Sequence, residues 1–258
     1  MERTPTPTRT PDAETLERAL ARSDVYRELA ALFRDPDDPQ IDARPELRIL
    51  RSAARRLGSS VADDTWSELR RIAHREERSA EHRAIFGHVV AHGCPPYETE
   101  FGRRHVFGQS QELGDIQGFY EAFGVRPRAG GERPDHLACE LEFLALLALK
   151  EAVAVAGNDD DRRQLCRRAA RDFLQDHPAR WVRAFAAQIA MRAPGSGYAA
   201  AAAVAATILG EHALAVGALP VVLDPDDLVP ILEEPDGFTF ECGVDVEAGD
   251  LAPPGSGS

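Results

Sequence analysis

Lysine is almost absent from this chain: of its 30 basic residues, 29 are arginine and one is Lys150. A phosphate-binding P-loop needs a Gly-Lys-Ser/Thr sequence, but Lys150 is preceded by Leu149, so a Walker-type nucleotide hydrolase is excluded. A Schiff-base enzyme would depend on Lys150, which lies in a helical pattern with no other sign of a site. The scarcity of lysine therefore removes two large classes of enzyme.

Paired cysteines and long apolar runs are also missing. The chain has four cysteines and no Cys-x-x-Cys pair, which predicts reduced thiols and a cytoplasmic protein. No apolar run approaches the roughly 18 residues of a membrane span, and the alanine-rich stretch 198–209 is shorter, so no stable membrane insertion is expected. The Thr/Pro-rich arm over residues 1–12 lacks an apolar centre, so we predict a disordered arm and no export signal.

Positive charge is missing from the C-terminal part of the sequence. Residues 221–258 contain ten acids and no Lys or Arg, and they account for most of the formal net charge of −13. General affinity for nucleic acids rests on a basic surface, so no nucleic-acid partner is expected. The tail is predicted to be mostly irregular. It is either a solvated segment that keeps the protein soluble, or one that steers or competes with an arginine-bearing ligand.

Helical periodicity dominates the remainder, and strand signals are limited to residues 221–223 and 238–240. The sequence therefore predicts an all-α bundle of about eight or nine helices. We expect a helical domain over residues 13–220, between the arm and the tail, with a hinge near residues 125–134, which are rich in Pro, Gly and Arg. The expected helices cover residues 12–34, 45–57, from about 62, 81–90, 107–124, 135–156, 160–176, 178–192 and 197–218.

Two short segments are more specific than a helical bundle requires. In Cys94-Pro-Pro-Tyr-Glu-Thr-Glu-Phe-Gly102, two prolines are followed by an aromatic residue and two carboxylates. A purely structural interpretation is a rigid connector anchored by its aromatic residues. In Arg133-Pro-Asp-His-Leu-Ala-Cys-Glu-Leu-Glu-Phe143, His136 and Glu140 are four residues apart and can pair on one helix face. The bland interpretation there is a capped helix with one solvated ion pair.

These segments carry a family resemblance. Pro134-Asp-His136 followed by Glu140-Leu-Glu-Phe143 resembles the P-D-H-x-x-x-E-L-x-F signature of the TorD/DmsD/NarJ-like chaperones of molybdenum-containing redox enzymes. The segments 81–87, 95–99, 111–120 and 173–181 look like further family elements in the same order, and the likeness spans about residues 14–220. Thr99 stands where many members have Ser, and the acidic tail has no counterpart.

The resemblance implies a cytoplasmic binding protein and no enzyme, with no catalytic residue, metal or cofactor of its own. Its implied partner is the precursor of a molybdopterin oxidoreductase catalytic subunit, of the dimethyl sulfoxide reductase superfamily. The chaperone would bind the precursor's twin-arginine signal peptide, aid cofactor insertion and prevent premature export. Carboxylates bind guanidinium groups bidentately, which fits such a leader. The expected signal-peptide-binding residues are Tyr97, Glu98, Glu100, Asp135, His136, Glu140 and Glu142.

Two alternatives from other classes stay open. A metal-binding protein or enzyme would use the cluster His82, His88, His92, Cys94 and His105, although no His-Glu-x-x-His motif accompanies it. A structural subunit of a respiratory complex would have the same helical fold without a cargo peptide. Both a monomer and a domain-swapped dimer are compatible with the hinge.

Overall fold

The computed structural model describes residues 11–39, 44–87, 94–101, 106–128 and 130–223. Within these ranges the chain is all-α, with nine α-helices, two 3₁₀ turns and no strand, which confirms the predicted fold class. The helices are α1 (Pro11–Phe33), α2 (Leu47–Leu57), α3 (Asp63–Leu69), α4 (Arg75–Phe86), α5 (Val106–Ala122), α6 (Leu137–Ala156), α7 (Asp160–Asp176), α8 (Pro178–Arg192) and α9 (Gly197–Val216). The 3₁₀ turns are η1 (Arg70–Ile72) and η2 (Glu98–Glu100).

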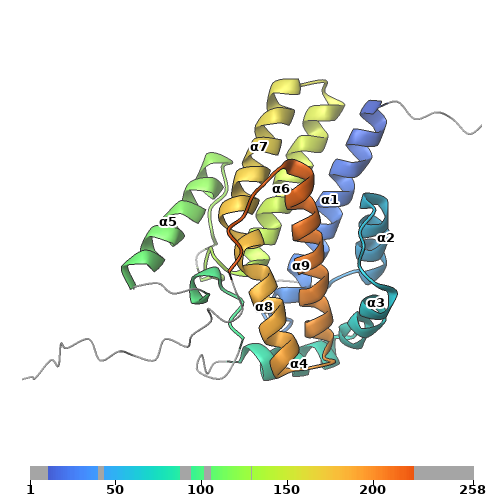
Figure 1. The fold of residues 1–258 in the computed structure, drawn as a ribbon, viewed down its shortest axis with the longest axis vertical. Helices are drawn as coiled ribbons and strands as arrows, with labels where there is room; N and C mark the ends of the chain where they lie inside the picture. Colours follow the sequence, from blue (N-terminus) through green and yellow to red (C-terminus); the bar gives the residue numbers. More distant parts are fainter. Residues whose placement is uncertain (1–10, 40–43, 88–93, 102–105, 129, 224–258) are drawn as a thin grey trace, which may run out of the picture.

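The centre of the bundle is formed by α1, α6, α8 and α9, with α2 and α3 along one edge and α5 along the opposite edge (Figure 1). Aromatic residues fill the middle of this core: Phe33 contacts both Phe185 and Tyr198, with ring centroids 5.8 and 6.3 Å apart. Burial of such large apolar side chains is the main contribution to folding. Figure 1 shows α7 and α8 following one another end to end, which places the junction at His177 beside the core.

Local signals in the sequence set most helix ends. Asp159 and Ser196 cap α7 and α9 by accepting hydrogen bonds from Arg162 N and Ala199 N. Pro178 opens α8, where its missing N–H costs nothing. Gly58 ends α2 with φ of 78°, a left-handed conformation that glycine adopts without strain.

Three expectations need correction. Helix α4 begins at Arg75, six residues before the predicted start at Glu81, and its predicted end lies outside the described residues. Residues 221–223 form no strand; Leu223 N donates instead to the carbonyl of Arg180, 2.9 Å away. The second predicted strand, 238–240, lies outside the described residues.

The third correction concerns α9. This helix has 20 residues and contains an 18-residue window with a mean hydropathy of 1.6, so by length and composition it is the one helix in the described ranges that could cross a membrane. The expectation that no stretch is long enough was therefore wrong. Half of that window is buried inside the protein, and Tyr198, Val204 and Leu209 lie fully in the core. Those contacts are what the core helix of a bundle requires.

Candidate functional site

The two segments singled out in the sequence lie side by side in the structure. Glu98 N donates to the carbonyl of Asp135 at 2.9 Å, and Leu137 N donates to the carbonyl of Pro96 at 2.8 Å. Tyr97 and His136 form an isolated antiparallel bridge between these bonds. The connector 94–101 is thus fixed by backbone hydrogen bonds to the residues that precede α6, and the predicted site residues on both segments come together.

Asp135 lies at the centre of this junction and has no exposed surface. Its carboxylate accepts hydrogen bonds from Thr99 Oγ1 at 2.8 Å, from Thr99 N at 3.2 Å, and from Arg133 Nε and Nη2 at 3.0 and 2.8 Å. Arg133 also donates to Glu100 at 3.1 Å. A buried carboxylate needs such partners because desolvation otherwise disfavours its charged form. Asp135 therefore joins the two segments through its side chain as well as its backbone.

Tyr97 lies at the edge of the same junction, partly exposed. The guanidinium carbon of Arg133 stands 4.6 Å from the centre of its ring, a cation–π distance. The Tyr97 hydroxyl donates to Glu132 at 2.8 Å, and burial together with that hydrogen bond raises the pKa of Tyr97 above its usual range. The phenol ring and the carboxylates of Glu100 and Asp135 thus all contact one guanidinium group, that of Arg133, whose side chain is 42% exposed.

His136 does not pair with Glu140, although their spacing of four residues predicts that they could. It is the N-cap of α6, and its Nδ1 accepts a hydrogen bond from Ala138 N at 3.0 Å. Burial, reinforced by Arg34, lowers the pKa of His136 to about 3. The imidazole is therefore neutral at physiological pH, and a cap role replaces the expected ion pair.

Glu140 lies deeper, in a second polar cluster within the core. Its Oε2 accepts from Trp181 Nε1 at 3.2 Å, and the carboxylate of Glu98 adjoins it and receives His177 Nδ1 at 3.1 Å. Burial, and then the Glu98 charge, raise the pKa of Glu140 well above its usual value. Two adjacent buried carboxylates cannot both be charged without a large penalty, and this favours the protonated form of Glu140.

This raised pKa makes a testable prediction. An acid whose pKa is higher in the folded state contributes stability that is fully present below its unfolded pKa and is lost progressively as pH rises toward its folded pKa. Glu140→Gln copies the protonated acid, so the variant is expected to gain stability relative to the wild-type protein as pH rises above about 4.5. Urea unfolding at a series of pH values measures this difference. A difference that does not change with pH would contradict the raised pKa of Glu140.

Glu142 points away from that cluster toward the hinge loop. Arg34 binds it through two hydrogen bonds, Nε to Oε1 at 2.9 Å and Nη2 to Oε2 at 2.5 Å, and half of the Glu142 side chain is exposed. The pair lies at the mouth of a hollow of about 380 Å³ between the end of α1, the end of α5, the loop and α6. Apolar and charged side chains both line this hollow, among them Arg34, Tyr120, Val125, Arg126, Glu132, Glu142, Phe143 and Leu146.

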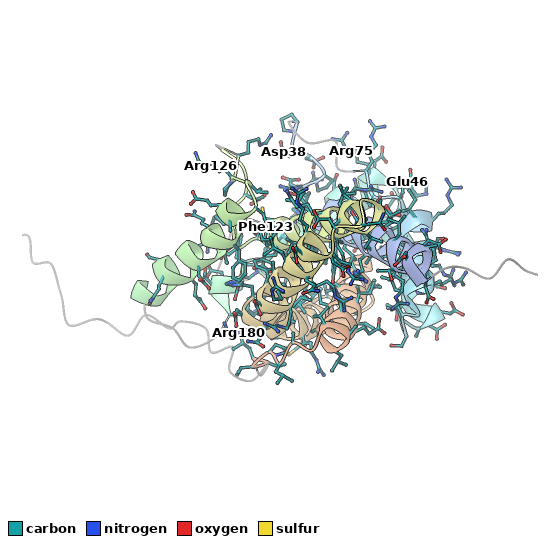
Figure 2. The ribbon with its side chains drawn as sticks, turned by 90° about the horizontal axis from the view of Figure 1, so that it is seen from above. Asp38, Glu46, Arg75, Phe123, Arg126 and Arg180 are labelled. Atoms are coloured by element: carbon teal, nitrogen blue, oxygen red, sulfur yellow. The ribbon has the colours of Figure 1, made fainter. Side chains whose placement is uncertain are left out.

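The loop that covers the hollow is fixed at both ends. Tyr120 accepts the N–H of Val125 on its carbonyl at 2.9 Å, and its hydroxyl donates to the carbonyl of Pro134 at 2.8 Å. Figure 2 shows Arg126 on this loop and Asp38 on the segment after α1, on the same side of the molecule, and Arg128 pairs with Asp38 at 3.4 Å. The hollow is therefore bounded by segments from three parts of the chain.

The sequence predicts which two segments form the site, but it does not predict which other residues contact them. It does not assign Arg133, Arg34, Glu132 or Trp181 to the site, although each contacts a predicted residue. Phe173, His177 and Trp181 follow one another at intervals of four, and this spacing is the one signal that pointed to the buried cluster. The arginines carry no such signal because 29 of them are spread along the chain.

Only two of the five residues of the predicted metal cluster, His82 and Cys94, lie within the described ranges. His88, His92 and His105 lie outside the described residues. Within the described part of the chain, no group of three or more His, Cys, Asp or Glu side chains is arranged to hold a metal ion. His82 instead contacts the rings of Phe86 and Tyr198, and burial lowers the pKa of His82. His82 thus has the surroundings of a core residue.

Comparison with known proteins identifies the family. Residues 50–187, more than half of the chain, match the model of the nitrate reductase delta subunit family. These residues contain both junction segments and the Phe173–Trp181 segment. The chain therefore belongs to this family, which confirms the resemblance to TorD/DmsD/NarJ-like proteins.

Three relatives are similar over shorter stretches. The chain is 43% identical over 83 residues to a selenate reductase assembly chaperone protein of Thauera selenatis, covering 32% of this chain and 42% of the relative. It is 50% identical over 60 residues to a dimethyl sulfide dehydrogenase assembly chaperone protein of Rhodovulum sulfidophilum, covering 22% and 23%. It is 44% identical over 77 residues to a chlorate reductase assembly chaperone protein of Ideonella dechloratans, covering 29% and 38%. The matched stretches span less than half the length of each relative.

Proposed function

We propose that this protein is an assembly chaperone that binds the precursor of a molybdenum-containing redox enzyme through its twin-arginine signal peptide. Membership of the family and the names of three relatives, each an assembly chaperone for a reductase or dehydrogenase, support the general role. In this proposal the protein acts in the cytoplasm, as a binding protein and not a catalyst. It retains the apoenzyme until its molybdopterin cofactor is inserted.

The observation that supports peptide binding most directly is the guanidinium position at the junction. Tyr97, Glu100 and Asp135 already surround one guanidinium, that of Arg133, with a ring face and carboxylate oxygens. This is the environment that an arginine side chain from another molecule requires. We infer that a leader arginine replaces Arg133 here, while a second pairs with Glu142 in exchange for Arg34.

The hollow beside these positions suits the rest of the leader. Its volume of about 380 Å³ and its apolar lining by Val125, Phe143 and Leu146 fit side chains of an apolar stretch. The predicted residues then divide by burial. Tyr97, Glu100 and Glu142 reach the surface, whereas Glu98, His136 and Glu140 are buried and would position the others without touching the peptide. Asp135 is buried as well, and in this proposal only the incoming guanidinium contacts it, in the place that Arg133 leaves.

Calorimetric titration of the full chain with a synthetic peptide tests this division. The peptide carries two consecutive arginines followed by an apolar stretch. We expect the double variant Glu100→Gln/Glu142→Gln to bind about tenfold or more weakly, because two charge-assisted contacts to guanidinium groups are lost. The control Glu68→Gln/Glu77→Gln makes the same change in charge by removing exposed carboxylates of α3 and α4. It should bind the peptide as tightly as the wild type does. Equal affinity for both double variants would refute the assignment.

Arg133→Gln should have the opposite effect. Removing the Arg133 guanidinium leaves Asp135 without its charged partner. A leader arginine can then bind Asp135 without having to displace Arg133. We expect the peptide to bind roughly three- to tenfold more tightly, although the free variant unfolds more easily. The same titration measures both affinities, and thermal unfolding without peptide gives the stability. Weaker binding by Arg133→Gln would mean that Arg133 shapes the site and does not occupy it.

A further inference from the structure

A second hollow, far from the junction, concentrates positive charge in an otherwise acidic protein. It has a volume of about 510 Å³ and lies between α2 and α3, on the edge of the bundle opposite α5 (Figure 1). We name it the arginine cleft, after the five arginines that line it: Arg48, Arg51, Arg55, Arg56 and Arg70.

The charge of the cleft is only partly balanced by its own surroundings. Arg51 pairs with Asp63 at 2.5 Å, Arg56 with Asp24 at 3.7 Å and Arg48 with Glu46 at 3.9 Å. Among the described residues, no carboxylate lies within ion-pair distance of Arg55 or Arg70. Both side chains belong to exposed residues. Guanidinium groups gathered in this way attract carboxylates or phosphates.

The floor of the cleft is apolar. Leu47, Trp66 and Leu69 line it; Leu47 is half-buried, Trp66 is 6% exposed and Leu69 is fully buried. An anion with no apolar part would leave the accessible surface of Leu47 and Trp66 in contact with water. A better fit is a peptide segment in which carboxylates flank large apolar side chains, because the acids meet the arginine rim while the apolar side chains cover the floor.

This chain itself contains such a segment. Residues 233–241 read Glu-Glu-Pro-Asp-Gly-Phe-Thr-Phe-Glu, with four acids, two phenylalanines and no base. We propose that the segment 233–241 docks in the arginine cleft of its own chain, with Phe238 or Phe240 on the floor and the carboxylates on Arg55 and Arg70. The proposal concerns a surface separate from the peptide site and does not depend on the proposed function.

The length of the chain permits this contact. Leu223 is fixed to the carbonyl of Arg180, at the start of α8. The 15 residues from there to Phe238 can extend to about 50 Å, whereas a folded domain of this size is about 45 Å across. A tethered segment also has an effective concentration in the millimolar range. Weak individual ion pairs are then sufficient for docking, and the contact should weaken as salt rises.

Docking would also change what the acidic tail does. Acids held on the arginine cleft are not available to compete for the arginines of a client peptide. The tail would then neutralise a basic surface of its own molecule. This differs from both roles that the sequence suggests, a purely solvated tail or one that acts on the ligand.

Photo-crosslinking in the full chain tests the proposal. Phe238 is replaced by p-benzoyl-phenylalanine, the protein is irradiated at low salt, and the crosslinked peptides are mapped by mass spectrometry. We expect crosslinks to residues 47–70. The variant Arg55→Gln/Arg70→Gln should lower their yield roughly three- to tenfold, since two exposed ion pairs are removed. The control Arg168→Gln/Arg183→Gln makes the same charge change on exposed residues of α7 and α8 and should leave the yield unchanged.

A mixture of ¹⁵N-labelled and unlabelled chains separates the two ways in which the segment can reach the cleft. Crosslinks within one isotopic copy support the proposal, whereas crosslinks between labelled and unlabelled copies would show that the cleft takes the segment of a second molecule. Crosslinks that fall mainly outside residues 47–70, or equal yields from the two arginine variants, would overturn it. A tail variant provides a second control. Replacing the four acids of 233–241 by their amides should reduce the yield more than replacing Asp224, Asp226, Asp227 and Asp245.

Discussion

Trp181→Ala is expected to lower the free energy of unfolding by roughly 3–5 kcal/mol, the cost of removing a fully buried tryptophan. The Trp181 ring lies 5.1 Å from that of Phe101 and 5.4 Å from that of Phe185, measured between centroids. It therefore connects the segment 94–101 to α8. Its indole N–H also donates to Glu140, which has no exposed surface, so the substitution leaves a buried carboxyl group with one partner fewer.

Chemical denaturation followed by circular dichroism measures this effect. Trp181→Phe is the matched control, because it keeps an aromatic ring against Phe101 and Phe185 but loses the N–H. We expect it to be clearly less destabilised than Trp181→Ala. A loss below about 1 kcal/mol for Trp181→Ala would contradict the packing described here, since a substitution of that kind at a fully buried site does not have so small a cost.

Asp135→Ala/His136→Ala is the second substitution with a large expected effect, roughly 3–5 kcal/mol of stability. Removing the Asp135 carboxylate leaves Thr99, itself buried, and Arg133 without their acceptor, and breaking a buried charged contact on one side is costly. Removing the His136 ring takes away the cap that accepts the N–H of Ala138. Both losses occur at the junction between the connector and α6.

The consequence for function follows from the same geometry. A weaker affinity for peptide in this variant would arise because the connector separates from α6, and a stabilising solvent additive such as trehalose should then restore part of the binding. The stability and the peptide affinity of Asp135→Asn, which keeps one acceptor oxygen, should lie between those of the wild type and the double variant. If instead the stability of the double variant is unchanged and only peptide binding is lost, the buried contacts of Asp135 and His136 do not hold the connector to α6, which would contradict the arrangement described here.

The fold could be predicted from the sequence because its signals are local. The helices α7 and α8 have the predicted bounds, since Asp159 and Pro178 mark their starts. The start of α4 was missed because its first turn, Arg75 to Arg78, is charged and gives no apolar periodicity. The error on α9 has a related cause. Its alanines make a long, weakly apolar helix whose membrane-like length is visible only when the whole element is defined.

The candidate site was harder to predict because its contacts are not local. The residues His136 and Glu140 have the spacing of a helical ion pair, yet each finds a better partner elsewhere: His136 caps its own helix, and Glu140 receives a hydrogen bond from Trp181 on α8. The spacing describes what two side chains can do on an isolated helix, whereas burial decides what they do in the core. The guanidinium position of Arg133 likewise depends on two segments that are more than thirty residues apart in sequence.

The central claim is that the protein recognises the guanidinium groups of a twin-arginine leader. Calorimetric titration of the full chain with two peptides that differ only in Arg-Arg or Lys-Lys tests it most directly, because both carry the same charge but lysine lacks the planar fork and stacks less well on a tyrosine ring. We predict that the Arg-Arg peptide binds about tenfold or more tightly, and that this preference disappears in the variant Tyr97→Ala/Glu100→Gln. Equal affinity of the wild-type protein for the two peptides, or no binding of either, would contradict the account.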